Sequence, residues 1–164
     1  MIKLLVLDVD GCLTDGGIIY SENGDEIKKF HVKDGFGIRA WIELGNEVAI
    51  ITGRQSSIVA KRAKELGIKH LFQNVKNKKL VLQELLRSLS LNSSEVAAIG
   101  DDINDFAMLQ YVAKSFTPKD GVVEIQEIVD TVLSKNGGDA AVREMIDILI
   151  ASNGQKKEFL ALWI

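Results

Sequence analysis

The sequence is poor in several residue types that would point to particular classes of protein: among its 164 residues are one cysteine, one proline and two histidines. A single cysteine cannot form an internal disulfide, so a disulfide-stapled secreted domain is excluded and a reducing, cytoplasmic location is expected. No apolar run approaches the ~20 residues that span a bilayer, and the first residues lack the pattern of a secretory signal peptide. The net charge of −3 provides no bulk attraction to nucleic acid or to a membrane surface, so neither is expected as a partner.

Short apolar runs that alternate with helical patterns indicate the fold class. The runs are unbroken and rich in Val, Ile and Leu, which is typical of strands covered on both faces. Repeated strand–helix–strand units predict an α/β fold, a doubly wound parallel sheet, in a single domain over residues 1–164. Residues 17–32, around an Asn-Gly turn, predict a projecting β-hairpin, and residues 152–164 form a tail with an apolar end. The expected strands are 2–7, 48–51, 70–72, 96–99, 113–116 and 131–133, and the expected helices are 37–44, 56–66, 78–89, 104–111 and 140–151.

Polar residues suited to chemistry stand at the ends of three expected strands. Asp8 and Asp10 follow the first strand, Thr52 and Arg54 follow the second, and Asp101 follows the fourth. In a parallel sheet these ends share one edge, where such folds bind ligands. Carboxylate oxygens suit Mg²⁺, one aspartate anion is a ready nucleophile, and a second carboxyl can protonate a leaving group and then activate water. The pattern therefore predicts Mg²⁺-assisted chemistry on a phosphate.

Other interpretations of the same motifs are weaker. An EF-hand calcium loop would need Asp or Asn at Cys12 and Glu at Ile19. The Gly-rich stretch 35–40 matches a loose dinucleotide fingerprint, but it does not follow the first strand of a βαβ unit. No P-loop motif is present, and Cys12 is expected to be a small buried filler behind the aspartate loop.

Four motifs in order resemble those of the haloacid dehalogenase superfamily of aspartate-nucleophile phosphatases. They are DVDGCLTDG from Asp8, TGR from Thr52, a lysine, and GDDIND from residue 100. The resemblance implies that Asp8 forms an aspartyl-phosphate, that Asp10 is the general acid and base, and that Thr52 and a lysine hold the phosphoryl group. The phase of the following helix favours Lys78 as that lysine, with Lys79 as the alternative. The implied Mg²⁺ ligands are Asp8, Asp10 through its main-chain carbonyl, and Asp101.

The spacing of the motifs leaves no room for a cap domain, so a neighbouring subunit is the natural lid of the site. Within the superfamily the chain most resembles the capless, tetrameric 3-deoxy-manno-octulosonate 8-phosphate phosphatases, over TDGGIIYSENGDEIKKFHVKDGFGIR, AIITGR and GGDAAVREMIDILI. This resemblance implies hydrolysis of a sugar-acid phosphomonoester in lipopolysaccharide synthesis by a homotetramer with shared active sites, in which the tail can cover a neighbour's site. The implied substrate contacts are His31, Val32, Lys33, Asp34, Gly35, Gly53, Arg54 and Arg62.

Three alternatives to this function stay open at the level of the sequence. The segment TPKDG, from Thr117, replaces the alanine-rich segment usual in that group, and relatives that act on nine-carbon sialic-type 9-phosphates share the scaffold. The same scaffold also occurs as a non-catalytic assembly module, although clustered carboxylates argue against that use here. A phosphomutase would normally need the cap that is absent.

Overall fold

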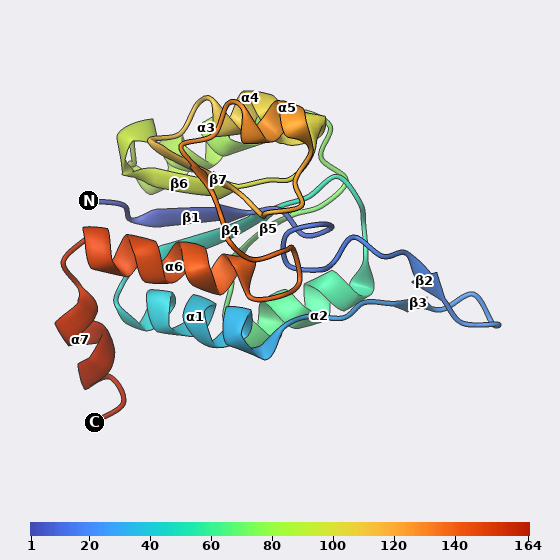
Figure 1. Ribbon diagram of the computed structural model, residues 1–164, viewed down its shortest axis with the longest axis horizontal. Helices are drawn as coiled ribbons and strands as arrows, with labels where there is room; N and C mark the ends of the chain where they lie inside the picture. The colour runs from blue at the N-terminus through green and yellow to red at the C-terminus, as the bar shows by residue number, and fades with distance from the viewer.

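A six-stranded parallel sheet forms the centre of the molecule in the computed structural model, which describes residues 1–164. The strand order is β5-β4-β1-β6-β7-β8, so the first strand lies in the middle and the chain winds outward in both directions (Figure 1). This arrangement confirms the predicted doubly wound α/β fold, and no separate cap domain is present. The strands are β1 (Leu4–Leu7), β4 (Glu47–Ile51), β5 (His70–Phe72), β6 (Val96–Ile99), β7 (Lys114–Thr117) and β8 (Thr131–Val132).

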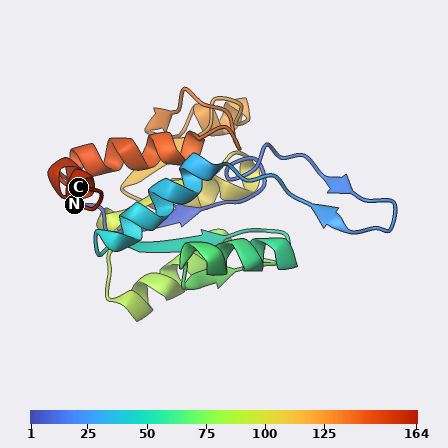
Figure 2. The same cartoon turned by 90° about the horizontal axis from the view of Figure 1, so that it is seen from below.

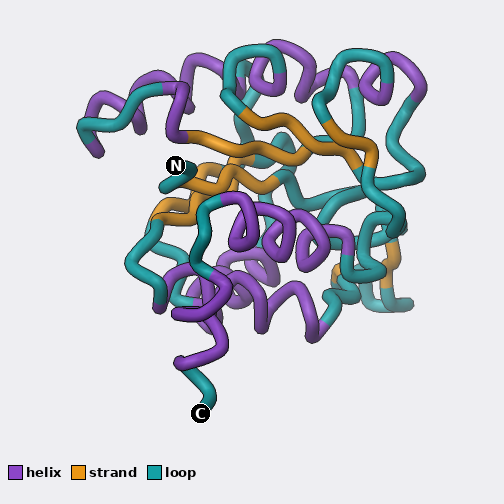
Figure 3. The backbone as a smooth tube through the Cα atoms, turned by 60° about the vertical axis from the view of Figure 1, so that its left-hand side comes forward, coloured by secondary structure: helices purple, strands orange, loops and turns teal.

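Helices cover both faces of the sheet, which explains the unbroken apolar runs. One core lies between the sheet and α1 (Val32–Glu43), α2 (Ser57–Leu66) and α6 (Ala141–Ser152). The other lies between the sheet and α3 (Lys78–Leu89), α4 (Phe106–Leu109) and α5 (Val123–Gln126). The two helical layers enclose the strands in Figure 3. Short 3₁₀ helices at Ser93–Glu95 and Ile103–Asp105 complete this part of the chain. None of the helices has both the length and the apolar character needed to cross a membrane.

The predicted hairpin is present, but its strands are shorter than expected. Strand β2 (Ile19–Tyr20) pairs with β3 (Glu26–Ile27) in antiparallel fashion, and the pair projects from the body of the molecule (Figure 2). The chain leaves the pairing after Ile27 because it must return to the sheet body and begin α1.

Helix α1 begins at Val32, five residues before its expected start at position 37. His31 is its N-cap, and Nδ1 of that side chain accepts a hydrogen bond from the Lys33 amide at 3.2 Å. Gly35 and Gly37 both lie in this helix, at positions where neighbouring side chains come close to the backbone. A Cβ on Gly35 would collide with the Arg62 guanidinium, and one on Gly37 would meet Arg143 Cδ at 3.0 Å. The glycines therefore let α2 and α6 approach α1 closely.

The C-terminal tail forms the unpredicted helix α7 (Lys156–Ala161) and packs on the protein's own α1. Its Phe159 and Trp163 rings lie 6.4 Å and 4.6 Å from the ring of Phe36, measured between centroids. The carbon Cζ of Arg143 on α6 lies 5.3 Å from the centre of the same Phe36 ring. Both chain ends lie at the end of the molecule opposite the hairpin (Figures 1 and 2).

Candidate active site

The ends of β1, β4 and β6 converge on one cleft at the carboxyl edge of the sheet, as the sequence predicts. The cleft has a volume of about 370 Å³, and no apolar side chain lines it. Its polar walls suit a small, highly charged ligand and would exclude little water by themselves. The lining residues are Asp8, Asp10, Thr52, Gly53, Arg54, Asp101, Asp102 and Asn104.

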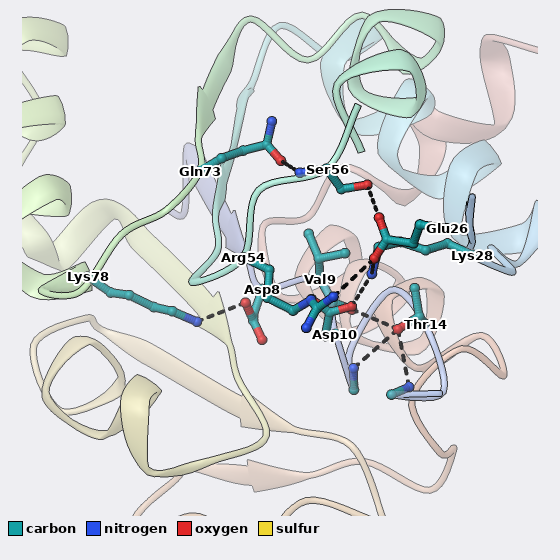
Figure 4. Close-up of polar contacts among 12 residues, drawn as sticks. Asp8, Val9, Asp10, Thr14, Glu26, Lys28, Arg54, Ser56, Gln73 and Lys78 are labelled. Atoms are coloured by element: carbon teal, nitrogen blue, oxygen red, sulfur yellow. Dashed lines mark hydrogen bonds and ion pairs between the residues drawn. The ribbon is translucent and has the colours of Figure 1, made fainter. Parts of the chain in front are cut away.

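Asp8 is held from inside the protein by a buried lysine at the start of α3. Lys78 Nζ donates hydrogen bonds to Asp8 Oδ1 at 2.8 Å and to Asp105 Oδ1 at 2.6 Å, and the lysine side chain is only 1% exposed. Burial alone would lower the pKa of Lys78, but the two carboxylates outweigh it and hold the pKa above its usual value. Lys79 instead faces the Tyr111 ring, with Nζ 5.3 Å from its centre. Of the two candidate lysines, only Lys78 contacts Asp8 (Figure 4).

Carboxylates lie close together beside Asp8, and a bound cation would offset the electrostatic repulsion between them. Oxygens of Asp8 and Asp101 and the sulfur of Cys12 lie within 4.8 Å of one another. Burial, together with the charges of Asp8 and Asp105, raises the pKa of Asp101 to about 8. Burial also raises the pKa of the Cys12 thiol well above its usual value, so a protonated, soft sulfur faces the carboxylates. The oxygen donors therefore fit a hard ion such as Mg²⁺, and Cys12 is the buried filler that was expected.

The turn after β1 brings its backbone close to Asp101. Gly11 adopts a φ of 91°, and a Cβ at this position would collide with Asp101 Oδ2. The Thr14 hydroxyl accepts hydrogen bonds from the amides of Gly11 at 3.3 Å and Gly16 at 3.2 Å. This turn fixes the direction in which Asp10 leaves the strand.

Asp10 is held from outside the sheet by the hairpin, which the sequence did not reveal. Lys28 Nζ forms an ion pair with Asp10 Oδ1 at 2.5 Å and a second with Glu26 Oε1 at 3.2 Å. Glu26 in turn accepts hydrogen bonds from Ser56 Oγ at 2.6 Å and Arg54 Nη2 at 3.3 Å (Figure 4). The alternation Glu26-Ile27-Lys28 was the available signal, because in an extended segment it places the two charged side chains on the same side of the chain, although β3 itself ends at Ile27.

Two further residues of the site had no role in the sequence interpretation. Asp105 ends the GDDIND motif, yet it proves to be the second carboxylate on Lys78 and accepts the Asp101 amide at 3.2 Å. Asn104 lines the cleft from the same motif.

The predicted substrate residues from His31 to Gly35, and Arg62, do not line the cleft of their own chain. Val32 is 77% exposed, whereas Asp34 is 1% exposed. Asp34 Oδ1 accepts the Arg143 amide at 2.7 Å at the start of α6, and Oδ2 has no partner. Burial raises the pKa of this carboxyl to about 6. Within one chain, Asp34 fastens α1 to α6.

Comparisons with known proteins identify the family. A family model described as haloacid dehalogenase-like hydrolase matches residues 70–146. The chain is 41% identical to the 3-deoxy-D-manno-octulosonate 8-phosphate phosphatase KdsC of Escherichia coli K12 over 157 residues, which cover 96% of this chain and 84% of that protein. The chain belongs to the 3-deoxy-D-manno-octulosonate 8-phosphate phosphatase family. The resemblance in the motifs is thereby confirmed, and the protein is a haloacid dehalogenase-like phosphoric monoester hydrolase.

Solved structures of this phosphatase family share the whole fold. One is the Moraxella catarrhalis enzyme in complex with a magnesium ion, a phosphate ion and a KDO molecule, with a TM-score of 0.96 and 38% identity. The match covers 99% of this chain and 94% of that one. Another is the cobalt-bound Haemophilus influenzae enzyme, with a TM-score of 0.89, 38% identity, and coverage of 93% and 90%.

Proposed function

We propose that this protein is a Mg²⁺-dependent phosphatase of 3-deoxy-D-manno-octulosonate 8-phosphate that acts in lipopolysaccharide synthesis. The observation that carries the proposal is the pairing of Asp8 with buried Lys78 beside Asp101, in a chain matched along nearly its whole length by phosphatases of that substrate. The nine-carbon substrate and the non-catalytic module are not favoured, because those relatives are named for the eight-carbon acid and the catalytic set is intact.

In the first half of the reaction, Asp8 is the nucleophile. One of its carboxylate oxygens forms a bond to phosphorus while the bond from phosphorus to the sugar oxygen breaks, and Asp10 gives its proton to that oxygen. Thr52 and Lys78 hold the phosphoryl oxygens, and Lys78 balances their charge. A magnesium ion, held by Asp8, Asp101 and the main-chain carbonyl of Asp10, would supply positive charge that offsets the repulsion between Asp8 and the phosphate.

In the second half, the aspartyl-phosphate is hydrolysed. Asp10, now a carboxylate, takes a proton from water while the water oxygen bonds to phosphorus and the bond from phosphorus to Asp8 breaks. Inorganic phosphate leaves, and both aspartates return to their starting protonation states.

A homotetramer with shared active sites accounts for the predicted substrate residues that lie away from the cleft. The hairpin exposes Ile19, Tyr20 and Ile27, with exposed fractions of 46–59%, although a two-stranded hairpin alone has little stability. Burial of this face between subunits would leave the exposed Val32 and Lys33 available to a neighbouring cleft, whereas Asp34 and Gly35 are buried within their own chain. The single buried cysteine is compatible with work in a reducing cytoplasm.

The test is phosphate release from a panel of sugar phosphates with and without Mg²⁺, together with the molecular mass in solution by light scattering. We expect Mg²⁺-dependent release with a preference for the octulosonate 8-phosphate, from a tetramer. A preference for a nine-carbon 9-phosphate would change the substrate and keep the mechanism. Absence of phosphomonoester hydrolysis with Mg²⁺ present would overturn the proposal.

A further inference from the structure

Lys28 is a buried cation that the reaction as described does not use. It comes from the hairpin, yet its side chain is only 1% exposed because it folds back against the turn that carries Asp10. Its ammonium group contacts two carboxylates, Asp10 and Glu26, and it is absent from the lining of the cleft. Burial of a charged side chain costs free energy unless hydrogen bonds and opposite charges compensate for the lost water. A buried lysine behind Asp10 therefore indicates a specific role.

The contacts of Asp10 differ between its two oxygens. Oδ1 is occupied by Lys28, whereas Oδ2 lies 3.9 Å from Arg54 Nε, beyond hydrogen-bonding distance. A carboxyl group that must donate a proton and take one back needs one oxygen free for that exchange and a fixed direction in which to present it. The ion pair leaves Oδ2 as the free oxygen.

We propose that Lys28 is the positioning residue of the general acid and base: it holds Oδ1 of Asp10, so that the proton passes to and from the substrate through Oδ2. This inference rests on the proposed function, in which Asp10 protonates the leaving sugar oxygen. Lys28 acts through Asp10, because it does not line the cleft.

Glu26 fixes Lys28 in place and joins the hairpin to the sheet body. One of its oxygens accepts from Arg54 and faces Lys28, and the other accepts from Ser56 at the start of α2. The Ser56 hydrogen bond, more than any other contact, keeps the pKa of Glu26 below its usual value. The Ser56 amide donates to Gln73 Oε1 at 2.8 Å, which links the Glu26–Ser56 contact to the segment after β5. The position of Lys28 is thus set from two elements of the sheet body.

The experiment compares two leaving groups in the wild type and in Lys28→Met, which keeps the length of the side chain and removes its charge. The sugar alkoxide of octulosonate 8-phosphate needs a proton to leave, whereas the phenolate of p-nitrophenyl phosphate does not. The value of kcat/KM reports the steps up to transfer of the phosphoryl group to Asp8. Lys29→Met is the matched control, because the Lys29 side chain is 70% exposed and pairs only with Asp15.

We expect Lys28→Met to lower kcat/KM for the sugar phosphate by roughly 10- to 100-fold, part of the ~10²–10⁴ that general acid catalysis supplies. For p-nitrophenyl phosphate the fall should be less than about threefold, because little acid catalysis is needed. Lys28→Arg should recover most of the loss, Lys29→Met should change neither substrate, and Asp10→Asn should show the same selectivity more strongly. Ser56→Ala is a milder variant that removes the hydrogen bond to Glu26. It should shift the ratio of the two kcat/KM values in the same direction.

Equal losses on both substrates in Lys28→Met and Ser56→Ala would assign Lys28 to binding or folding and overturn the inference. So would an unchanged kcat/KM on the sugar phosphate. If the wild type hydrolyses neither compound, the proposed function is wrong and the role of Lys28 falls with it.

Discussion

The two aspartates of the DVDG motif are held by lysines that come from opposite parts of the molecule. Lys78 reaches Asp8 from α3, within the layered body of the sheet, and its second partner Asp105 is also at the sheet edge. Lys28 reaches Asp10 from the hairpin, outside the sheet. Both lysine side chains are 1% exposed, so the difference lies in what supports them and not in solvent access.

This difference separates the two chemical roles. Asp8, the proposed nucleophile, is fixed by the core, where the strands and α3 pack against each other. Asp10, the proposed acid and base, is fixed by the hairpin, which has two residues in each strand and is expected to gain its stability from contacts with other elements. Substitutions in the core should therefore slow the hydrolysis of every substrate. Substitutions in the hairpin should slow the hydrolysis of those substrates whose leaving group needs a proton.

The largest effect is expected for Asp8→Asn, which removes the proposed nucleophile. Phosphate release should fall by at least about 10⁴-fold with every substrate, as for loss of a nucleophile in other enzymes. The fold should persist, because the Asn carbonyl can still accept the hydrogen bond from Lys78. Circular dichroism checks the fold, and Asp147→Asn on the exposed side of α6 is the control. Normal turnover in Asp8→Asn would break the mechanism.

Lys78→Met should have the next largest effect and should not distinguish between substrates. Loss of the charge that faces the phosphoryl group is expected to lower kcat/KM by roughly 10²–10³-fold for both octulosonate 8-phosphate and p-nitrophenyl phosphate. Two buried carboxylates lose their partner, which should also destabilise the protein by about 3–5 kcal/mol.

Urea unfolding measures the stability change in Lys78→Met, and Lys79→Met, which leaves the contacts of Asp8 intact, is the control. A substrate-selective loss like that expected for Lys28→Met would erase the contrast between the two lysines.

The residues of the site that could be predicted are those marked by a pattern in the sequence immediately around them. Asp8, Thr52 and Asp101 each follow a buried strand, so a parallel sheet was enough to bring them together. Lys28 acts on Asp10 through a fold-back of the hairpin, and Glu26 meets Ser56 across 30 positions of sequence. No periodicity in the sequence predicts such contacts, because they depend on how the hairpin packs against the rest of the molecule.

The fold shows the same division between local and distant signals. The unbroken apolar runs predicted the sheet, since covered strands need apolar residues on both faces. The expected start of α1 at position 37 was wrong because His31 caps the helix five residues earlier, and that capping hydrogen bond was not read from the sequence. The apolar end of the chain indicated docking, but its partner Phe36 could be found only in the structure.

A smaller effect, on the free energy of unfolding, is expected for Asp34, which follows the hairpin and joins the start of α1 to α6. Its pKa is raised to about 6 by burial, with Arg143 opposing the rise and His31, Arg62 and Asp139 nearby. A raised pKa stabilises the fold at low pH, and this contribution is lost as the pH rises through about 4 to 6. The free energy of unfolding of the wild type, relative to Asp34→Asn, should therefore fall by about 2 kcal/mol between about pH 4.5 and about pH 7.5.

Urea unfolding at the two pH values checks the role of Asp34, with Asp25→Asn, at an exposed position of the hairpin, as the control. A difference between wild type and Asp34→Asn that does not vary with pH would mean that Asp34 is charged in the fold throughout this range. The contact between α1 and α6 would then be made by a buried carboxylate and not by a neutral carboxyl group.

The smallest effect is expected for Trp163→Ala, at the end of the molecule farthest from both lysines. The Trp163 ring is half exposed and packs on Phe36, so its loss should cost about 1 kcal/mol. In a domain of this size that corresponds to a fall of about 2–4 °C in Tm. Ile164→Ala, at a fully exposed position, is the control and should leave Tm unchanged. If Trp163→Ala also leaves Tm unchanged, the tail is not fastened to α1 in solution. In the proposed tetramer the tail would then have a neighbouring subunit to dock on, and, like the hairpin, it would support the site from outside the core.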